Sequence, residues 1–342
     1  MTVSINGTNG LTFNDNSTQA TAATGFGFKN RIINGDMRID QRNAGAASAN
    51  TINNYFLDRW YVQQNVTGKL IAQQNQGSVT PPAGFTHYLG VTSQSAYTVG
   101  ASETFAILQP IEGFNVADLA FGTANASAVT LSFRVYSSLT GTFGGSLQNS
   151  AVNRSYPFTY TIASANTWTT VSITIPGDTT GTWLTNSGVG LYITFGLGAG
   201  STRSGTAGAW AGARYDSATG ATSVVGTTGA TFYITGVQLE KGSTATSFDY
   251  RDYGRELAMC QRYYYQYSGD FRLPLVRNDT PVRQNTFNTK VTMRTAPTVA
   301  NITASGTTTL LASDVDSVCL TSSAGTLTSS ISVSAFTASS EL

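Results

Sequence analysis

Apolar and polar residues alternate with a period of two through the middle of the chain. In the run AVTLSFRVY, residues 128–136, one side carries the apolar residues Val129, Leu131, Phe133 and Val135. Shorter runs of the same kind occupy residues 158–162, 171–175, 189–195 and 232–234. Because successive side chains of a strand point to opposite faces, these runs predict β-strands with one buried face.

The last of these runs changes phase. Val237 and Leu239 are one residue out of step with Phe232 and Ile234, which predicts a β-bulge at Gly236. Turn residues separate the runs between residues 66 and 240, and no helical pattern intervenes. The sequence therefore predicts an all-β fold built as an antiparallel sandwich.

The chain has 342 residues, which suggests about two domains. We expect a main sandwich over residues 30–265 that ends in one short helix, and a small C-terminal β-domain over residues 266–342. Residues 1–29 carry too little apolar surface to fold alone. They are either a disordered tail or an N-terminal docking arm that becomes ordered against neighbouring chains, and Leu11 and Phe13 alternate like a short strand.

The helix is predicted from four apolar residues at helical spacing, with Asp252 as the N-cap. The apolar stripe consists of Tyr253, Leu257, Cys260 and Tyr264, and the opposite side carries Arg251, Arg255 and Arg262. The stripe packs either on the end of its own sandwich, which we favour, or on symmetry mates.

Two local features near the start of the main domain predict anchoring contacts. Asn34-Gly35 is a tight turn between apolar residues. Asp58-Arg59 lies inside a cluster of aromatic and apolar residues, and an unpaired buried charge is costly. We therefore expect Asp58 or Arg59 to be paired.

Only 11% of the residues are charged and the net charge is +1, so no basic surface for nucleic acid is expected. Uncharged polar residues suit neutral partners such as sugars.

No run approaches the length of a membrane span, and the start of the chain does not resemble a secretory signal. Cys260 and Cys319 match no zinc or redox spacing, and we expect two buried free thiols rather than a disulfide.

The sequence offers little for catalysis. His87 is the only histidine, which excludes a histidine-based triad and a histidine-rich metal site. Carboxylate pairs such as Asp314 with Asp316, or Asp249 with Asp252, arise easily by chance among 18 acidic residues. We expect no enzymatic activity and no cofactor.

The long loop predicted over residues 196–230 holds the best candidate ligand site. It brings together Trp210, Arg214, Tyr215 and Asp216, and a sugar site needs aromatic faces beside planar polar groups. Trp210 alternatively pins the loop onto the sheet, which is the interpretation we favour.

Two pairs of motifs carry a resemblance to known families. RIINGDMRI (31–39) and FYITGVQLEKG (232–242) resemble the first and last strands of carbohydrate-binding jelly rolls from bacterial glycanases. That resemblance implies a jelly-roll topology and a structural calcium held by acidic residues of those strands. Arg38 and Thr235-Gly236 stand where acidic residues would be expected, and Asp36 with Glu240 is too few for calcium, so we predict no metal there.

The second resemblance is closer and covers most of the chain. The NGD-containing opening, Asp58-Arg59-Trp60 and the closing segment 236–264, which contains QLE and ends in ELAMCQRYY, resemble bacteriophage tail-fibre and virion appendage proteins. Residues 1–29 and the terminal Ser340-Glu341-Leu342 also resemble such proteins.

This resemblance implies a structural protein of the virion, assembled in the host cytoplasm as a homotrimer and active in host attachment. Residues 1–29 would then contact other virion proteins, and the outer face would bind a host-surface glycan. The first alternative is a carbohydrate-binding module, and the second is a glycan-cleaving enzyme.

Overall fold

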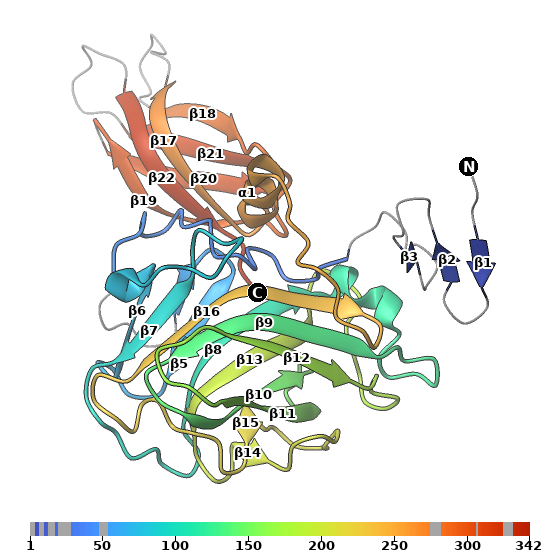
Figure 1. Cartoon of the computed structure of the whole chain (residues 1–342). Helices are drawn as coiled ribbons and strands as arrows, with labels where there is room; N and C mark the ends of the chain where they lie inside the picture. Colours follow the sequence, from blue (N-terminus) through green and yellow to red (C-terminus); the bar gives the residue numbers. More distant parts are fainter. Residues whose placement is uncertain are drawn as a thin grey trace.

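Two facing antiparallel sheets form the larger body of the molecule, as Figure 1 shows. The computed structural model describes residues 4–6, 10–12, 18–19, 29–47, 54–273, 282–305, 307–323 and 331–342. Successive strands from β8 to β16 cross repeatedly from one sheet to the other. This connection makes the body an all-β jelly-roll sandwich, as the sequence predicted.

One sheet has six strands, which in spatial order are β11 (Ser155–Ile162), β10 (Gly141–Gln148), β13 (Val189–Ala199), β8 (Thr104–Glu112), β5 (Trp60–Gln64) and β4 (Asn54–Leu57). The other has five, in the order β12 (Thr169–Ile175), β9 (Val129–Ser137), β16 (Thr231–Lys241), β7 (Leu89–Ser93) and β6 (Leu70–Gln74). The connections carry the short helices η1 (Gln76–Ser78), η2 (Gly113–Asn115) and η3 (Ala117–Leu119) and the two-residue strands β14 (Ser204–Gly205) and β15 (Ser217–Ala218).

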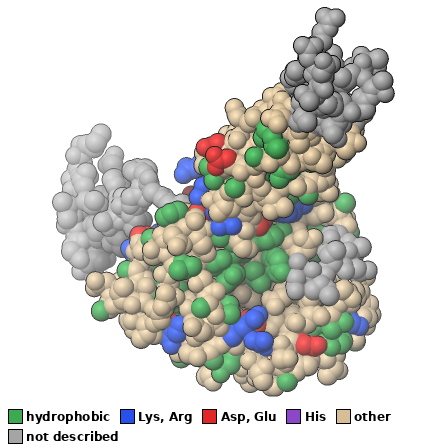
Figure 2. Space-filling view, turned by 180° about the vertical axis from the view of Figure 1, so that it is seen from behind, with side chains coloured by type: hydrophobic (Ala, Val, Ile, Leu, Met, Phe, Trp, Pro, Cys, Tyr) green, Lys and Arg blue, Asp and Glu red, His purple; other side chains and the backbone are tan. Residues whose placement is uncertain are grey.

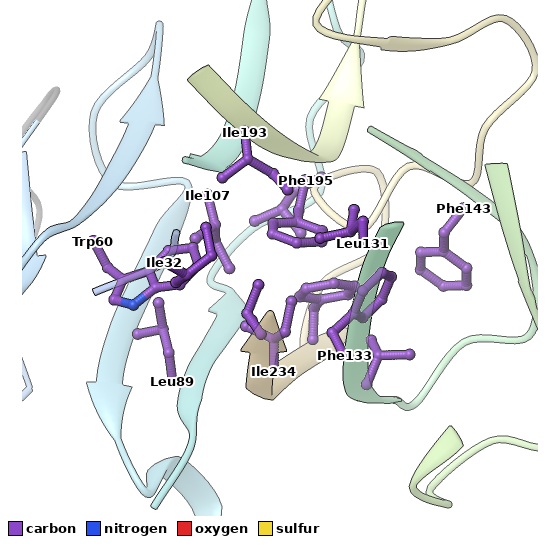
Figure 3. Close-up of a cluster of buried hydrophobic side chains, with 14 of the residues drawn as sticks. Ile32, Trp60, Leu89, Ile107, Leu131, Phe133, Phe143, Ile193, Phe195 and Ile234 are labelled. Atoms are coloured by element: carbon purple, nitrogen blue, oxygen red, sulfur yellow. The ribbon is translucent and has the colours of Figure 1, made fainter. Parts of the chain in front are cut away.

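The apolar residues of the alternating runs meet between the two sheets. Figure 3 shows Ile107, Ile193 and Phe195 from the six-stranded sheet facing Leu131, Phe133 and Ile234 from the five-stranded sheet. All four apolar residues of the run 128–136 are fully buried, which confirms the predicted inward face. The opposite faces of both sheets remain available to solvent or to loops.

The predicted bulge and the predicted turn both lie where the chain's opening meets β16. Gly236 has a φ of 61°, and the pairing of β16 with β9 shifts between Thr235 and Gln238. Asn34 and Met37 close a tight turn, with 3.1 Å between the Asn34 carbonyl oxygen and the Met37 nitrogen. The opening segment therefore runs beside β16, to which it is joined by a hydrogen bond from the Val237 nitrogen to the Gly35 oxygen.

The helix α1 (Tyr253–Gln261) begins at the predicted N-cap, since the Asp252 carboxylate accepts a hydrogen bond from the Arg255 nitrogen. The predicted apolar stripe is wrong in detail. Tyr253 is 56% exposed, and Tyr264 already belongs to the next strand. Glu256 is buried instead, because its carboxylate accepts a hydrogen bond from the Asn34 nitrogen and pairs with Arg251.

Two of the three arginines expected on the side opposite the stripe make contacts with other parts of the larger body. The Arg251 side chain is 6% exposed and donates to the Asn30 and Ile32 carbonyl oxygens of the opening segment. Arg262 pairs with Glu112 of β8 at 2.7 Å. The helix therefore packs on the end of its own sandwich, against Ile33 and Ile39.

A smaller body of two three-stranded sheets follows the helix. One contains β17 (Tyr264–Leu273), β22 (Ile331–Ser339) and β19 (Thr298–Ala304), and the other contains β18 (Val282–Asn288), β21 (Ser317–Ser323) and β20 (Thr308–Asp314). Its core is small and includes Tyr265, Met293, Val318 and Phe336. Both cysteines are free, as predicted, although Cys319 is partly exposed and only Cys260 is buried.

The described part of residues 1–29 contains a sheet of three short antiparallel strands, β1 (Ser4–Asn6), β2 (Gly10–Thr12) and β3 (Thr18–Gln19). The predicted strand at Leu11 is present, and Phe13 lies outside the described residues. Among the helices that the structure describes, none has the length and apolar character needed to span a bilayer.

Candidate functional site

The candidate functional site is a groove of about 370 Å³ on the outer face of the six-stranded sheet. Figure 2 views the molecule from behind and shows hydrophobic side chains gathered near the centre of the larger body. The groove is lined by Tyr55, Tyr61, Gln63, Leu108, Pro110, Gln148, Ser150, Val152, Tyr192, Thr194, Arg214, Asp216 and Leu342. Its lining therefore mixes aromatic rings with amides, hydroxyls and one arginine.

Strand pairing sets the floor of the groove in two rows. In one row Tyr61 pairs with Leu108, Leu108 with Thr194, and Thr194 with Ser146. In the next row Pro110 pairs with Tyr192, and Tyr192 with Gln148. These residues lie two positions apart along each strand, so they share the outer face while their neighbours fill the core.

The tyrosines present their rings to the groove, and the hydroxyl of Tyr55 is the one that the protein itself uses, as a donor to the Leu342 carbonyl oxygen. Tyr55 and Tyr61 meet edge to face with 5.2 Å between ring centroids. Tyr192 lies two strands from Tyr61, about 10 Å away across the sheet. Burial raises the pKa of Tyr61 and of Tyr192, so both phenols stay protonated at neutral pH. Among the described residues, the side chains of Tyr61, Gln63 and Tyr192 have no hydrogen-bond partner.

The connection between β13 and β16 forms one wall of the groove. Ser155 of β11 and Ala211 of this connection exchange backbone hydrogen bonds, which ties the wall to the sheet edge. Asp216 is buried and accepts hydrogen bonds from Thr104 at 2.6 Å and Gln148 at 2.9 Å. It also holds the Arg214 Nε atom at 3.2 Å.

The last residues of the chain form the opposite wall. The Leu342 carbonyl oxygen accepts a hydrogen bond of 2.9 Å from the Tyr55 hydroxyl. Next to it, the Glu341 carboxylate pairs with both Arg42 and Arg59. Arg59 is only 1% exposed and lies 3.6 Å from the centroid of the Tyr263 ring.

The prediction that Asp58 or Arg59 is paired is confirmed for Arg59. Glu341 neutralises Arg59, and the carboxylate of Asp58 accepts two hydrogen bonds of 2.7 Å from Gln41. Burial raises the pKa of Asp58 to about 6. These pairs fix the hairpin between β4 and β5 that carries Tyr55 and Tyr61 into the groove.

The four site residues proposed from the sequence separate in the structure. Arg214 and Asp216 line the groove. Trp210 points away from it, donates to the Pro176 oxygen at 2.7 Å and packs against Tyr156 and Trp183, so it pins the connection to the sheet.

Tyr215 contributes a backbone oxygen that accepts from Gln148 at 2.8 Å, and its ring lies against Gly205. Trp210 and Tyr215 are therefore supporting residues rather than groove residues.

Sequence reasoning missed Tyr61, Tyr192, Gln63 and Gln148. Tyr61 lies in the aromatic and apolar cluster around Asp58-Arg59, and Tyr192 lies within the alternating run 189–195, but neither was considered as a ligand-binding residue. The sequence signal that could have identified Tyr192 is its position between the buried residues Leu191 and Ile193. Because side chains alternate along a strand, this position places Tyr192 on the outer face. That the outward faces of β5 and β13 are neighbours could not be read without the strand order.

The two carboxylates of the expected calcium position are held by protein groups. Asp36 pairs with Arg38, and Glu240 accepts hydrogen bonds from Gln238 and from Thr246. Within the residues that the structure describes, no group of three or more His, Cys, Asp or Glu side chains is placed to hold a metal.

No protein-family model and no curated protein sequence matches the chain. Similar solved structures include the enzymatically active domain of tailspike protein 4 from bacteriophage CBA120, with 11% identity over 54% of this chain and 19% of that chain, and a TM-score of 0.32. A family 11 carbohydrate-binding module from Clostridium thermocellum, in complex with a mixed-linked tetrasaccharide, has 10% identity over 58% of this chain and 99% of the module, with a TM-score of 0.29.

The N-terminal cellulose-binding domain of β-1,4-glucanase C from Cellulomonas fimi has 13% identity over 52% of this chain and 90% of that domain, with a TM-score of 0.24. All three similarities are distant, and this chain spans only 19% of the tailspike structure. The functional argument therefore depends on the groove.

Proposed function

We propose that the chain binds a glycan in the groove on its six-stranded sheet. The observation that supports this most directly is the combination of Tyr55, Tyr61 and Tyr192 with unpartnered polar side chains in an open hollow. Tyrosine rings can cover the CH faces of sugar rings, and amide and hydroxyl groups can hydrogen-bond sugar hydroxyls. The low charge of the whole chain also suits such a partner.

We propose binding without cleavage. Glycoside hydrolysis ordinarily requires two carboxyl groups placed on either side of the scissile bond. Within the part of the groove lining that the structure describes, Asp216 is the one acidic side chain, and Thr104, Gln148 and Arg214 already occupy its oxygens. These features favour a binding face over a hydrolase site.

We further propose that the protein is a subunit of a phage virion appendage, a tail fibre or a fibre-like structure. The support is the sequence resemblance, whose motifs meet at one place in the molecule. Asn34 of the NGD opening contacts Glu256 of the closing segment, and Arg59 stacks on Tyr263. In this proposal a homotrimer assembles in the host cytoplasm, residues 1–29 contact other virion proteins, and the groove faces the host surface.

Substitution of the groove tyrosines tests glycan binding. Tyr61→Ala and Tyr192→Ala should each weaken binding to a responsive polysaccharide by about fivefold, because each removes one ring contact worth roughly 1 kcal/mol. Affinity electrophoresis of the full chain through gels containing a polysaccharide panel measures this. Tyr250→Ala is the matched control, since Tyr250 is 57% exposed and packs on Phe248 and Phe85, away from the groove. Unchanged binding in both groove variants would contradict the proposal.

Light scattering of the purified chain tests the appendage proposal separately. A trimer is expected, and three grooves on one particle raise apparent affinity by about 10²–10⁴ over a single groove. A stable monomer that still binds glycan through Tyr61 and Tyr192 would contradict the fibre proposal and favour the alternative of a carbohydrate-binding module.

A further inference from the structure

We infer that the groove selects glycans that carry a carboxylate, and that Arg214 binds this group. The inference rests on the proposed glycan binding and adds the class of ligand. Among the described residues that line the groove, Arg214 is the one with a basic side chain. Its position therefore determines which groups of a sugar chain can be bound at that end of the groove.

The Arg214 guanidinium is held on one edge and left open on the other. Its Nε atom lies 3.2 Å from Asp216 Oδ1, and the side chain is 32% exposed. Among the described residues, its two terminal nitrogens have no hydrogen-bond partner. A fixed guanidinium with two free terminal nitrogens offers the fork of parallel N–H groups that matches a carboxylate.

Other arginines of the chain contrast with this arrangement. Arg154 uses Nε and Nη2 to hold Asp178 at 2.8 and 2.6 Å, and Arg262 uses the same two atoms to hold Glu112. In both residues, one terminal nitrogen therefore hydrogen-bonds a carboxylate of the protein itself. Arg214 makes only the Nε contact, as Arg203 does with the Ser102 oxygen, but Arg214 lines the groove and Arg203 does not.

The negative charge beside Arg214 does not block an anionic ligand. The side chain of Asp216 is only 3% exposed, and its other hydrogen bonds come from Thr104 and Gln148. The carboxylate thus lies beneath the surface with its oxygens directed to protein donors. The guanidinium also lowers the pKa of Tyr192, against a larger rise from burial, which places its positive charge within reach of the groove tyrosine.

A uronic acid combines the two features that the groove offers to a ligand. Its ring can lie on Tyr61 or Tyr192, and its carboxylate can accept two hydrogen bonds from Arg214. Sulfated and phosphorylated sugars share the negative charge but not the planar carboxylate, so they serve as comparison probes.

The test compares acidic polysaccharides with their own neutral derivatives. Alginate, hyaluronan and polygalacturonate are each measured before and after chemical reduction of their carboxylates to alcohols, with dextran sulfate as a non-carboxylate anion. We expect the full chain to bind at least one of the three acidic polymers about 10- to 100-fold more tightly than its reduced form, which is the range for a charge-assisted hydrogen-bond pair. Arg214→Gln should abolish this ratio, and Arg214→Lys should restore part of it.

Arg134→Gln is the matched control, because it removes the same charge from the outer side of the other sheet, on β9. It should leave the ratio unchanged. An equal loss with Arg134→Gln, or tight binding of dextran sulfate that survives Arg214→Gln, would show a general charge effect and overturn the inference.

The two proposals fail in different ways. Binding of neutral polymers that is lost in Tyr61→Ala but shows no preference for carboxylates would overturn the acidic-ligand inference and leave glycan binding intact. Absence of binding to every acidic and neutral polymer would overturn both.

Discussion

At the scale of single residues, position relative to the sheet decides what an aromatic side chain does. Tyr61 and Tyr192 stand on the outer face and line the groove, whereas Trp210 turns inward and packs with Tyr156 and Trp183. The indole nitrogen of Trp210 is already bonded to the Pro176 oxygen. Residues of one chemical type therefore divide between the groove, where we propose ligand binding, and the packing that stabilises the fold.

This division predicts opposite behaviour for two substitutions. Trp210→Ala should lower the free energy of unfolding by about 3 kcal/mol, because it removes a large packed side chain, while the folded protein keeps its glycan affinity. Tyr192→Ala should lower affinity with a smaller loss of stability. Urea unfolding and affinity electrophoresis at low temperature measure the two effects. Loss of affinity in Trp210→Ala with unchanged stability would return Trp210 to the binding site.

At the scale of elements, the bulge in β16, the central strand of the five-stranded sheet, contacts both the loop before β7 and the opening segment. Gly236 takes a φ of 61°, and a Cβ atom there would lie 2.6 Å from the Phe85 ring. The bulge also brings the Val237 nitrogen to the Gly35 oxygen of the opening segment. The conformation of Gly236 therefore determines the path of β16 and its contacts with the loop before β7 and with the NGD turn.

Gly236→Ala should therefore lower the free energy of unfolding by more than left-handed backbone strain alone would. We expect a loss of about 2–4 kcal/mol, the sum of left-handed strain and a steric clash with Phe85. Gly229→Ala separates the two causes, since Gly229 has a φ of 76° and open space around the Cβ position. Thermal unfolding of both variants gives the comparison, and equal losses would exclude a contribution from Phe85.

The elements also show how far the sequence could lead. Period-two runs predicted the strands, the buried face of β9 and the bulge, because these depend on neighbours along the chain. The helix face was predicted wrongly, because Glu256 is buried by partners from residues 30–34, more than 200 positions away. The groove was missed for the same reason, since its rows exist only once β5, β8, β13 and β10 are placed side by side.

At the scale of the whole molecule, the chain contributes to the groove through the residues that follow the last strand of the smaller body. After β22 the chain returns to the larger body, where the Ser340 nitrogen bonds the Tyr263 oxygen and Leu342 lines the groove. Arg294 of the smaller body donates to the Ser187 oxygen of the larger one at 3.0 Å. The groove is therefore built by both bodies, and its shape depends on how they are joined.

Glu341 is the residue on which this junction depends most. Its carboxylate neutralises Arg59, which is 1% exposed, and also pairs with Arg42. Glu341→Ala would leave a buried guanidinium without its partner, so we expect a loss of about 3–5 kcal/mol in unfolding free energy. Because Leu342 would lose its anchor beside Tyr55, glycan affinity should fall as well.

Asp316→Ala is the control, since Asp316 is an exposed carboxylate of the same body. If Glu341→Ala lowers stability but leaves groove affinity unchanged, the larger body shapes the groove alone and the smaller body has another role.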